Sequence, residues 1–153
     1  DLVRLQGESS RLYQRLVAQE QLAIDVGGGL QETMDPFLFF IQVKPKPDAD
    51  VNRIEQIIDE ELLKVQSAGV QQKEIEKAIN IIQTRFYTSQ QTIAGKANNL
   101  GVAEVMYGDY TALFDRMTRY QGLTAEPIKA AAARYFDANK KTLGLVLPKG
   151  GSR

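Results

Sequence analysis

Histidine, cysteine and tryptophan are absent from this chain of 153 residues. Without histidine and cysteine, the chain cannot build a His/Cys zinc site, a Ser-His-Asp triad, a cysteine nucleophile or a disulfide. An excess of either charge is also missing, because 19 Lys and Arg balance 19 Asp and Glu. This balance argues against nucleic-acid binding, which needs clustered basic residues. Any chemistry of the chain is limited to carboxylate, lysine, tyrosine and hydroxyl groups.

Long hydrophobic runs are missing as well. No run approaches the ~18–20 residues of a membrane-spanning helix. The longest, residues 36–41, has the length of a strand, and we expect it at the centre of a sheet. The chain begins with Asp1, without an initiator methionine or a signal peptide. Its length fits one globular domain, which we expect to be a piece of a longer protein.

The spacing of the apolar residues predicts an α+β domain. Apolar positions three or four apart are typical of helices, and alternating or continuous short apolar runs are typical of strands. The expected elements are a helix at 11–17, strands at 22–26 and 37–43, helices at 51–68, 71–86, 93–100, 109–122 and 124–136, and a closing strand at 142–147. Gly69 should end one helix and Thr124 should cap another. This order predicts a mostly antiparallel sheet with helices packed on one face.

Two stretches could be interpreted as ligand sites. Gly27, Gly28 and Gly29 follow a strand, as a phosphate loop does, but another strand follows them and neither phosphate-loop spacing is present. We interpret the run as a bulge or a flexible strand end. The acidic residues at 55 and 59–61 lack a loop that would converge their oxygens on a cation. We expect them, and the charged residues at 73–77, to form solvated helix faces.

The segment GESSRLYQRLV at 7–17, followed by EQLAIDV at 20–26, resembles the insulinase/pitrilysin zinc peptidases, the inverted zincins. That family has a G-x-S-S-R-L-[FY]-x-x-L-R helix, then E-x-x-L-A-Y and a strand. The apolar strand at 37–43, the helix before Gly69 and the LGLVLP segment at 143–148 agree with the family in the same order.

The resemblance implies a half-domain. In this family two homologous α+β units face each other across a chamber that holds an extended peptide, and the first unit binds zinc through H-x-x-E-H and a distant Glu. This chain resembles the second, C-terminal unit, with the half-domain at 1–148 and a tail at 149–153. The N-terminal strand and part of the first helix of that unit are missing from it. The resemblance therefore implies no cofactor on this chain and zinc in the missing N-terminal half.

Two positions depart from the family pattern. In second units that support peptidase activity, Arg ends the helix and Tyr lies seven residues later, and both contact the substrate. The matching residues here are Val17 and Ile24, and neither can donate a hydrogen bond. Either a partner subunit supplies the Arg/Tyr pair, or the chain comes from a catalytically inactive homologue.

The expected function is that of a C-terminal, non-catalytic half of a bacterial zinc metallopeptidase. It would form a chamber wall that holds an extended peptide, with strand 22–28 as a possible acceptor edge, and would pack against the zinc-bearing half or a paired homologous subunit. A periplasmic or otherwise exported location is expected. The alternatives are an inactive structural or assembly subunit of the same fold and an unrelated α+β ligand-binding domain.

Overall fold

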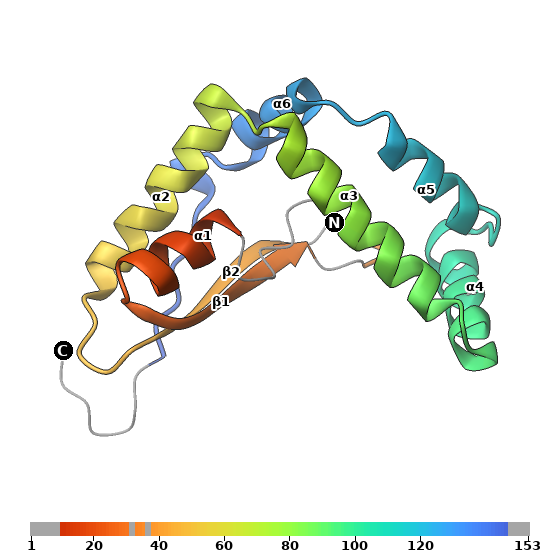
Figure 1. Ribbon diagram of the computed structural model, residues 1–153, viewed down its shortest axis with the longest axis horizontal. Coiled ribbons are helices and arrows are strands. Elements are labelled where there is room, and N and C mark those ends of the chain that lie inside the picture. The colour runs from red at the N-terminus through yellow and green to blue at the C-terminus, as the bar shows by residue number, and fades with distance from the viewer. Residues whose placement is uncertain (1–9, 31–32, 36–37, 147–153) are drawn as a thin grey trace.

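Ten segments of regular structure follow one another in the described part of the chain (Figure 1). The structure is a computed structural model that describes residues 10–30, 33–35 and 38–146. The elements are α1 (Arg11–Tyr13), the π-helical segment η1 (Gln14–Gln19), β1 (Ala23–Leu30), β2 (Phe39–Pro45), α2 (Val51–Ala68), α3 (Gln72–Ser89), α4 (Ile93–Tyr107), α5 (Ala112–Gln121), α6 (Ala125–Tyr135) and the 3-10 turn η2 (Ala138–Lys140). The predicted α+β class is confirmed. The predicted tail at 149–153 lies outside the described residues.

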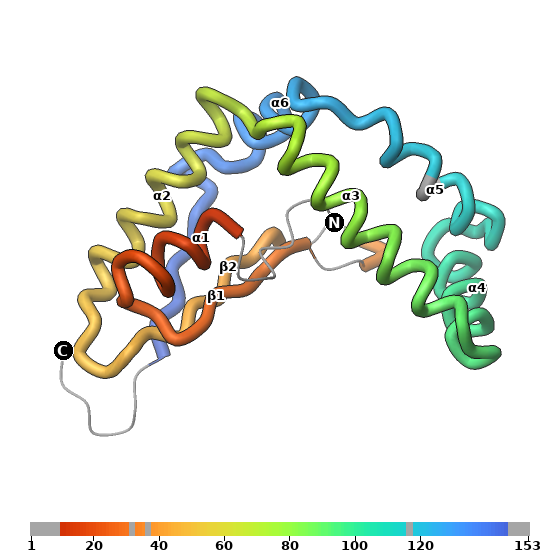
Figure 2. The backbone as a smooth tube through the Cα atoms, viewed as in Figure 1, coloured from red at the N-terminus to blue at the C-terminus, as the bar shows by residue number. Residues whose placement is uncertain are grey.

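The helices and strands form an arch (Figure 2). One arm holds the sheet, α1, η1 and α2, and α3 leads away from it toward α4. The chain returns through α5 to α6, which packs against α2. The predicted interruption after α3 is confirmed, because α3 ends at Ser89 and α4 begins at Ile93.

The buried core lies where α1, η1, β1 and α2 meet. Its members are Leu12, Leu16, Ala23, Val26, Ile54 and Ile57. Along β2, Phe39, Ile41 and Val43 are half-buried and alternate with exposed residues, so only one face of the sheet is covered. Because burying a Leu or Ile side chain contributes roughly 1.5–3 kcal/mol, this small cluster holds the first helical segment, the sheet and α2 together.

The sheet consists of two antiparallel strands in the described part of the chain, with Val26 opposite Val43. Three strand predictions need correction. β1 continues through the glycines to Leu30, so they are neither a loose strand end nor the bulge, which lies between Ala23 and Asp25.

The other two corrections concern strand position. β2 begins at Phe39 and is an edge strand of this two-stranded sheet, and Leu38 is 73% exposed. The prediction that 36–41 forms a sheet centre is therefore wrong for the described residues, with 36 and 37 outside them. Residues 142–146 form no strand, because no described strand pairs with them, and residue 147 is not described.

Capping chemistry sets both ends of α2 but not the start of every helix, since Thr111 at the N-cap of α5 makes no side-chain capping hydrogen bond. Asp50 Oδ1 accepts a hydrogen bond from the N–H of Asn52 at 2.9 Å and begins α2. Gly69 ends α2 with φ 75°, the left-handed conformation that glycine adopts without strain. Thr124 precedes α6 as predicted, but its side chain makes no capping hydrogen bond.

Replacing Gly28 by alanine is expected to destabilise the sheet. Gly28 has φ 153°, and a Cβ atom there would collide with the carbonyl oxygen of Phe40 on β2. We expect a loss of about 1–3 kcal/mol, the cost of a strained backbone position, measured by urea denaturation. Gly27→Ala is the matched control, because a Cβ at Gly27 has no atom within 4 Å. Equal losses in the two variants would contradict this account.

Candidate functional site

The two positions predicted to match the Arg/Tyr pair of the insulinase/pitrilysin peptidases lie on either side of the turn from η1 into β1. Val17 lies in η1, half-buried and packed against the core cluster. Ile24 lies in β1 and is 49% exposed. The register pairs Ala23 with Pro45 and Asp25 with Lys44, so Ile24 sits at a β-bulge. π-helical turns and β-bulges are uncommon and occur often beside functional sites.

Backbone hydrogen bonds within the η1–β1 segment fix its conformation. The N–H of Glu20 donates to the carbonyl of Arg15 at 2.9 Å, a π-helical bond, and the N–H of Leu22 donates to the carbonyl of Leu16 at 2.9 Å. Gln21 takes a left-handed φ of 53° between them. The turn from η1 into β1 is thus well defined. Val17 and Ile24, which are predicted to match the Arg/Tyr pair, carry apolar side chains that cannot donate a hydrogen bond.

One edge of β1 is unpaired among the described residues, because β2 occupies the other. Ile24 gives this strand an exposed apolar side chain beside the bulge. Gly28 approaches a neighbouring backbone closely, but that backbone belongs to β2 of the same chain. The glycine therefore allows the close pairing of β1 with β2, and the edge of β1 that no described strand covers is a candidate edge for strand addition.

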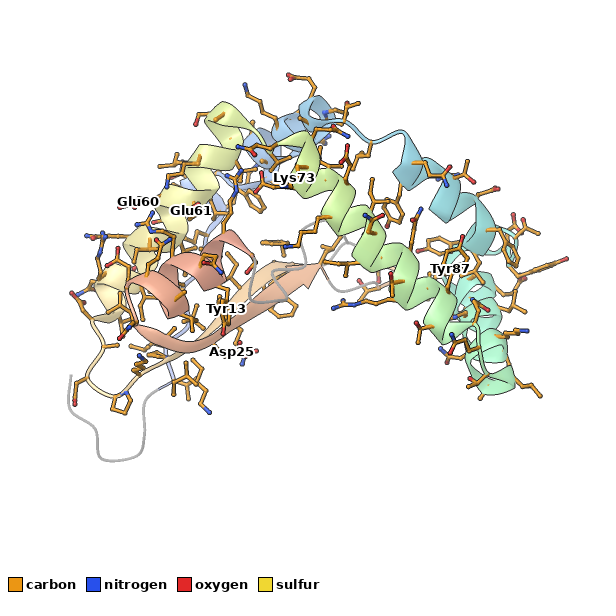
Figure 3. The ribbon with its side chains drawn as sticks, viewed as in Figure 1. Tyr13, Asp25, Glu60, Glu61, Lys73 and Tyr87 are labelled. Atoms are coloured by element: carbon orange, nitrogen blue, oxygen red, sulfur yellow. The ribbon has the colours of Figure 1, made fainter. Side chains whose placement is uncertain are left out.

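Charged residues fix the first helical segment onto α2 (Figure 3). Arg15 Nη1 donates to Glu61 Oε1 at 2.9 Å and Arg15 Nη2 donates to Glu60 Oε2 at 3.0 Å. Lys64 Nζ donates to the same Glu61 oxygen at 2.7 Å. The hydrogen bond from Arg15 lowers the pKa of Glu60 and raises that of the guanidinium. The prediction of a solvated acidic face is wrong for Glu61, which is 6% exposed.

Arg11 and Glu74 form a second link, between α1 and α3. Arg11 Nε and Nη2 each donate to a Glu74 carboxylate oxygen at 2.7 Å. The N–H of Gln71 donates to Glu74 Oε2 at 2.8 Å, so Glu74 also caps α3. The Arg11 hydrogen bond lowers the pKa of Glu74. The charged stretch at 73–77 is therefore only partly a solvated face, because Glu74 forms an ion pair with Arg11 of another helix.

This pair gives the fold a pH dependence. The pKa of Glu74 is lower in the folded chain than its unfolded value of about 4.3. The pair therefore stabilises the fold above that value and loses its effect as the pH falls through the folded pKa. Because both side chains are about one-third exposed, we expect Glu74→Gln to cost up to about 1 kcal/mol at pH 7.

The measurement is urea denaturation of the parent chain and Glu74→Gln between pH 7 and pH 3. The difference in unfolding free energy should narrow as the pH drops below about 4. Glu76→Gln serves as the control, since Glu76 makes no ion pair within the described residues. A difference that stays constant down to pH 3 would contradict the assignment.

Within the described ranges, no three His, Cys, Asp or Glu side chains come together in a way that could hold a metal ion. No described helix is both long and apolar enough to cross a membrane. The candidate sites in this part of the chain are the irregular η1–β1 segment, the β1 edge and a hollow between α3, α4 and α5.

The chain is similar to known proteins. The family model described as peptidase M16 inactive domain matches residues 3–82. An uncharacterized zinc protease of Streptomyces coelicolor is 25% identical over 126 residues, which make up 82% of this chain and 27% of that protein. The chain thus spans about a quarter of the length of this relative.

Solved structures agree with the fold. The inactive peptidase domain of a Bordetella parapertussis protein has a TM-score of 0.84 at 24% identity, over 97% of this chain and 80% of that one. A peptidase M16 inactive domain from Pseudomonas fluorescens has a TM-score of 0.78 at 20% identity, over 91% and 33% of the two chains.

Proposed function

Because this chain belongs to the peptidase M16 family, through the inactive domain of that family, we propose that it is the non-catalytic wall of a peptide-holding chamber. In this role it packs against a zinc-bearing N-terminal half or a paired homologous subunit. The zinc of such a protein would lie in that other half and would activate the water that attacks the peptide bond. This chain would supply shape and strand pairing.

The η1–β1 segment is the observation that carries the proposal. It lies inside the matched range of 3–82, and its backbone has the irregular form typical of functional segments. Val17 and Ile24 cannot donate a hydrogen bond to an oxyanion, which is what such donors contribute in hydrolases. The segment can therefore enclose a peptide without stabilising the negative charge that develops during hydrolysis.

The free edge of β1 supplies the means of holding a peptide. An extended peptide that adds to a sheet edge gains main-chain hydrogen bonds and needs few specific side chains. The exposed Ile24 would contact one apolar side chain of that peptide. A chamber wall that relies on main-chain pairing would accept many peptide sequences.

Titration of the isotope-labelled chain with an unstructured peptide tests the proposal. We expect amide chemical shifts to change across residues 23–30 and to saturate. The control is the same peptide N-methylated at alternate residues, which cannot pair along a strand and should leave these signals in place. Unchanged signals across 23–30 with the unmodified peptide would overturn the peptide-holding role.

A structural or assembly subunit of the same fold is the second candidate. The half-buried position of Val17 against the core favours it, because a residue packed in this way stabilises the domain itself. The full-length parent protein distinguishes the two functions. Chelator-sensitive cleavage of a peptide by that protein supports the chamber wall, and the absence of cleavage in a zinc-loaded preparation supports the structural subunit.

A further inference from the structure

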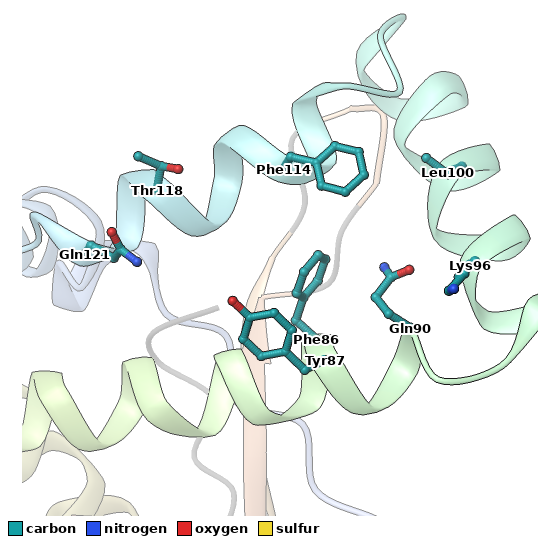
Figure 4. A pocket seen from close by; sticks show the side chains of 8 residues that line it. All are labelled: Phe86, Tyr87, Gln90, Lys96, Leu100, Phe114, Thr118 and Gln121. Atoms are coloured by element: carbon teal, nitrogen blue, oxygen red, sulfur yellow. The ribbon is translucent and has the colours of Figure 1, made fainter.

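A hollow of about 550 Å³ lies between α3, α4 and α5 (Figure 4). This volume is in the range of small-ligand pockets, roughly 300–1,000 Å³. The hollow is lined by residues from the C-terminal turns of α3, the first half of α4 and one side of α5. It is formed by different elements from the η1–β1 segment and is not used by the proposed chamber wall.

Most of the surface of this hollow is apolar. Phe86 rises from α3 and Phe114 faces it from α5, with Leu100 on α4. None of the lining residues is acidic, and Lys96 is the charged residue among them. The hollow thus combines an apolar surface with one positive charge, which suits a ligand that has an apolar group and an anionic group.

A buried donor without a partner lies in the same place. Gln90 Nε2 exposes less than 1 Å² and has no hydrogen-bond partner in the described structure. Buried polar groups are nearly always paired, and an exception calls for a missing partner. Figure 4 shows the Gln90 amide directed into the space between α4 and α5. An acceptor that enters the hollow can pair with this N–H group when the Gln90 side chain turns toward it.

Lys96 lies on the same side of the hollow as Gln90 (Figure 4). It makes no ion pair with any described residue. A carboxylate is an acceptor that both groups can bind, because an ammonium and an amide N–H both donate to its oxygens. The two donors therefore define the anion-binding end of the hollow, and the aromatic rings define its apolar end.

Hydrogen bonds hold the helices around the hollow in place. Asn99 Nδ2 on α4 donates to Ser89 Oγ on α3 at 2.8 Å, and Ser89 Oγ in turn donates to the carbonyl of Phe86 at 2.7 Å. Thr92 Oγ1 accepts from the N–H of Gly95 at 3.0 Å and fixes the start of α4. The turn between α3 and α4 is thus set before a ligand binds, which limits the ordering cost of binding.

We propose that this hollow binds the C-terminal end of a peptide, with the terminal carboxylate on Lys96 Nζ and Gln90 Nε2. The last side chain of that peptide is aromatic or large and aliphatic, and it packs against Phe86, Leu100 and Phe114. The choice of a peptide rests on the proposed peptide-holding function. A chamber with such a pocket would anchor a peptide end at a distance from the β1 edge.

The test compares N-acetyl-Leu-Phe as the free acid with the same dipeptide as its C-terminal amide. By titration of the labelled chain, we expect the acid to shift the side-chain amide signals of Gln90 and the amide to bind at least tenfold more weakly. Lys96→Met should weaken binding of the acid about tenfold. Lys77→Met on α3 is the control, and it should leave binding unchanged. Lys96 is exposed, so its variant should keep the fold.

Three outcomes would overturn the pocket: no binding of the acid, equal binding of acid and amide, or equal affinity in the parent chain and Lys96→Met. The β1 titration distinguishes failure of the pocket from failure of the proposed function. A peptide that shifts the amide signals of residues 23–30 and leaves the side-chain amide signals of Gln90 unchanged refutes the pocket alone. Shifts at Gln90 without any change across 23–30 refute the chamber wall and retain the pocket.

Discussion

Leu16→Ala is expected to remove a large part of the stability of the domain. Leu16 lies in η1, is 0% exposed and belongs to the buried cluster with residues of β1 and α2. Truncating a fully buried leucine costs about 2–5 kcal/mol, because apolar contacts are lost and a cavity remains. The total stability of a domain is about 5–15 kcal/mol. The variant should therefore unfold at much lower urea concentration than the parent chain.

The control for this substitution is Leu63→Ala on α2. Leu63 has the same side chain but is 60% exposed. Its substitution should therefore change the unfolding free energy by no more than about 0.5 kcal/mol, as is usual for surface positions. Unfolding curves followed by far-ultraviolet circular dichroism give both values. Similar midpoints for the two variants would show that the cluster around Leu16 is not the main core of the folded chain.

Arg15→Met is expected to have the second-largest effect. The side chain of Arg15 is 21% exposed and that of Glu61 is 8% exposed. The substitution therefore leaves a largely buried carboxylate, with Lys64 as its remaining ion-pair partner in the described structure. Breaking a fully buried pair costs roughly 3–5 kcal/mol, and because Lys64 remains, we expect about 2 kcal/mol here. Methionine keeps most of the volume, so the loss reports mainly on charge and hydrogen bonding.

Two further variants complete this test. Arg53→Met removes more exposed ion pairs with Glu20 and Glu60 and should cost at most about 1 kcal/mol. The double variant Arg15→Met, Glu61→Met should be more stable than Arg15→Met alone, because no buried carboxylate is left uncompensated. If the double variant is the less stable of the two, Arg15 and Glu61 stabilise the fold in another way.

Much of the fold follows from apolar spacing, because that spacing reports directly on helix and strand periods. The helices from α2 to α6 are confirmed, although α4 continues to Tyr107 instead of ending near residue 100. The resemblance to the insulinase/pitrilysin peptidases agrees with the match to the peptidase M16 inactive domain. Strand pairing is less predictable. It depends on which other strands are present, and residues 142–146 have the composition of a strand but no described partner.

The candidate site also has a part that the sequence predicts and a part that depends on the folded structure. Positions 17 and 24 follow from alignment to the family motif, but the π-helical turn and the bulge that present them do not. A π-helical and an α-helical turn carry similar apolar patterns, so hydrogen bonding alone separates them. The burial of Glu61 was not predicted because its partner Arg15 lies 46 residues earlier. Among consecutive acidic residues on a helix, only tertiary contacts decide which one faces inward.

The arched arrangement described above has a consequence for local opening. The main buried cluster holds α1, η1, β1 and α2, and the arm of α3, α4 and α5 contributes only Ile75, at the start of α3, and Ala103 to the described buried residues. Regions with few buried contacts open without global unfolding. We therefore expect the amide hydrogens of α4 and α5 to exchange with solvent through partial openings that leave α2 folded, as in two cooperative units of unequal stability.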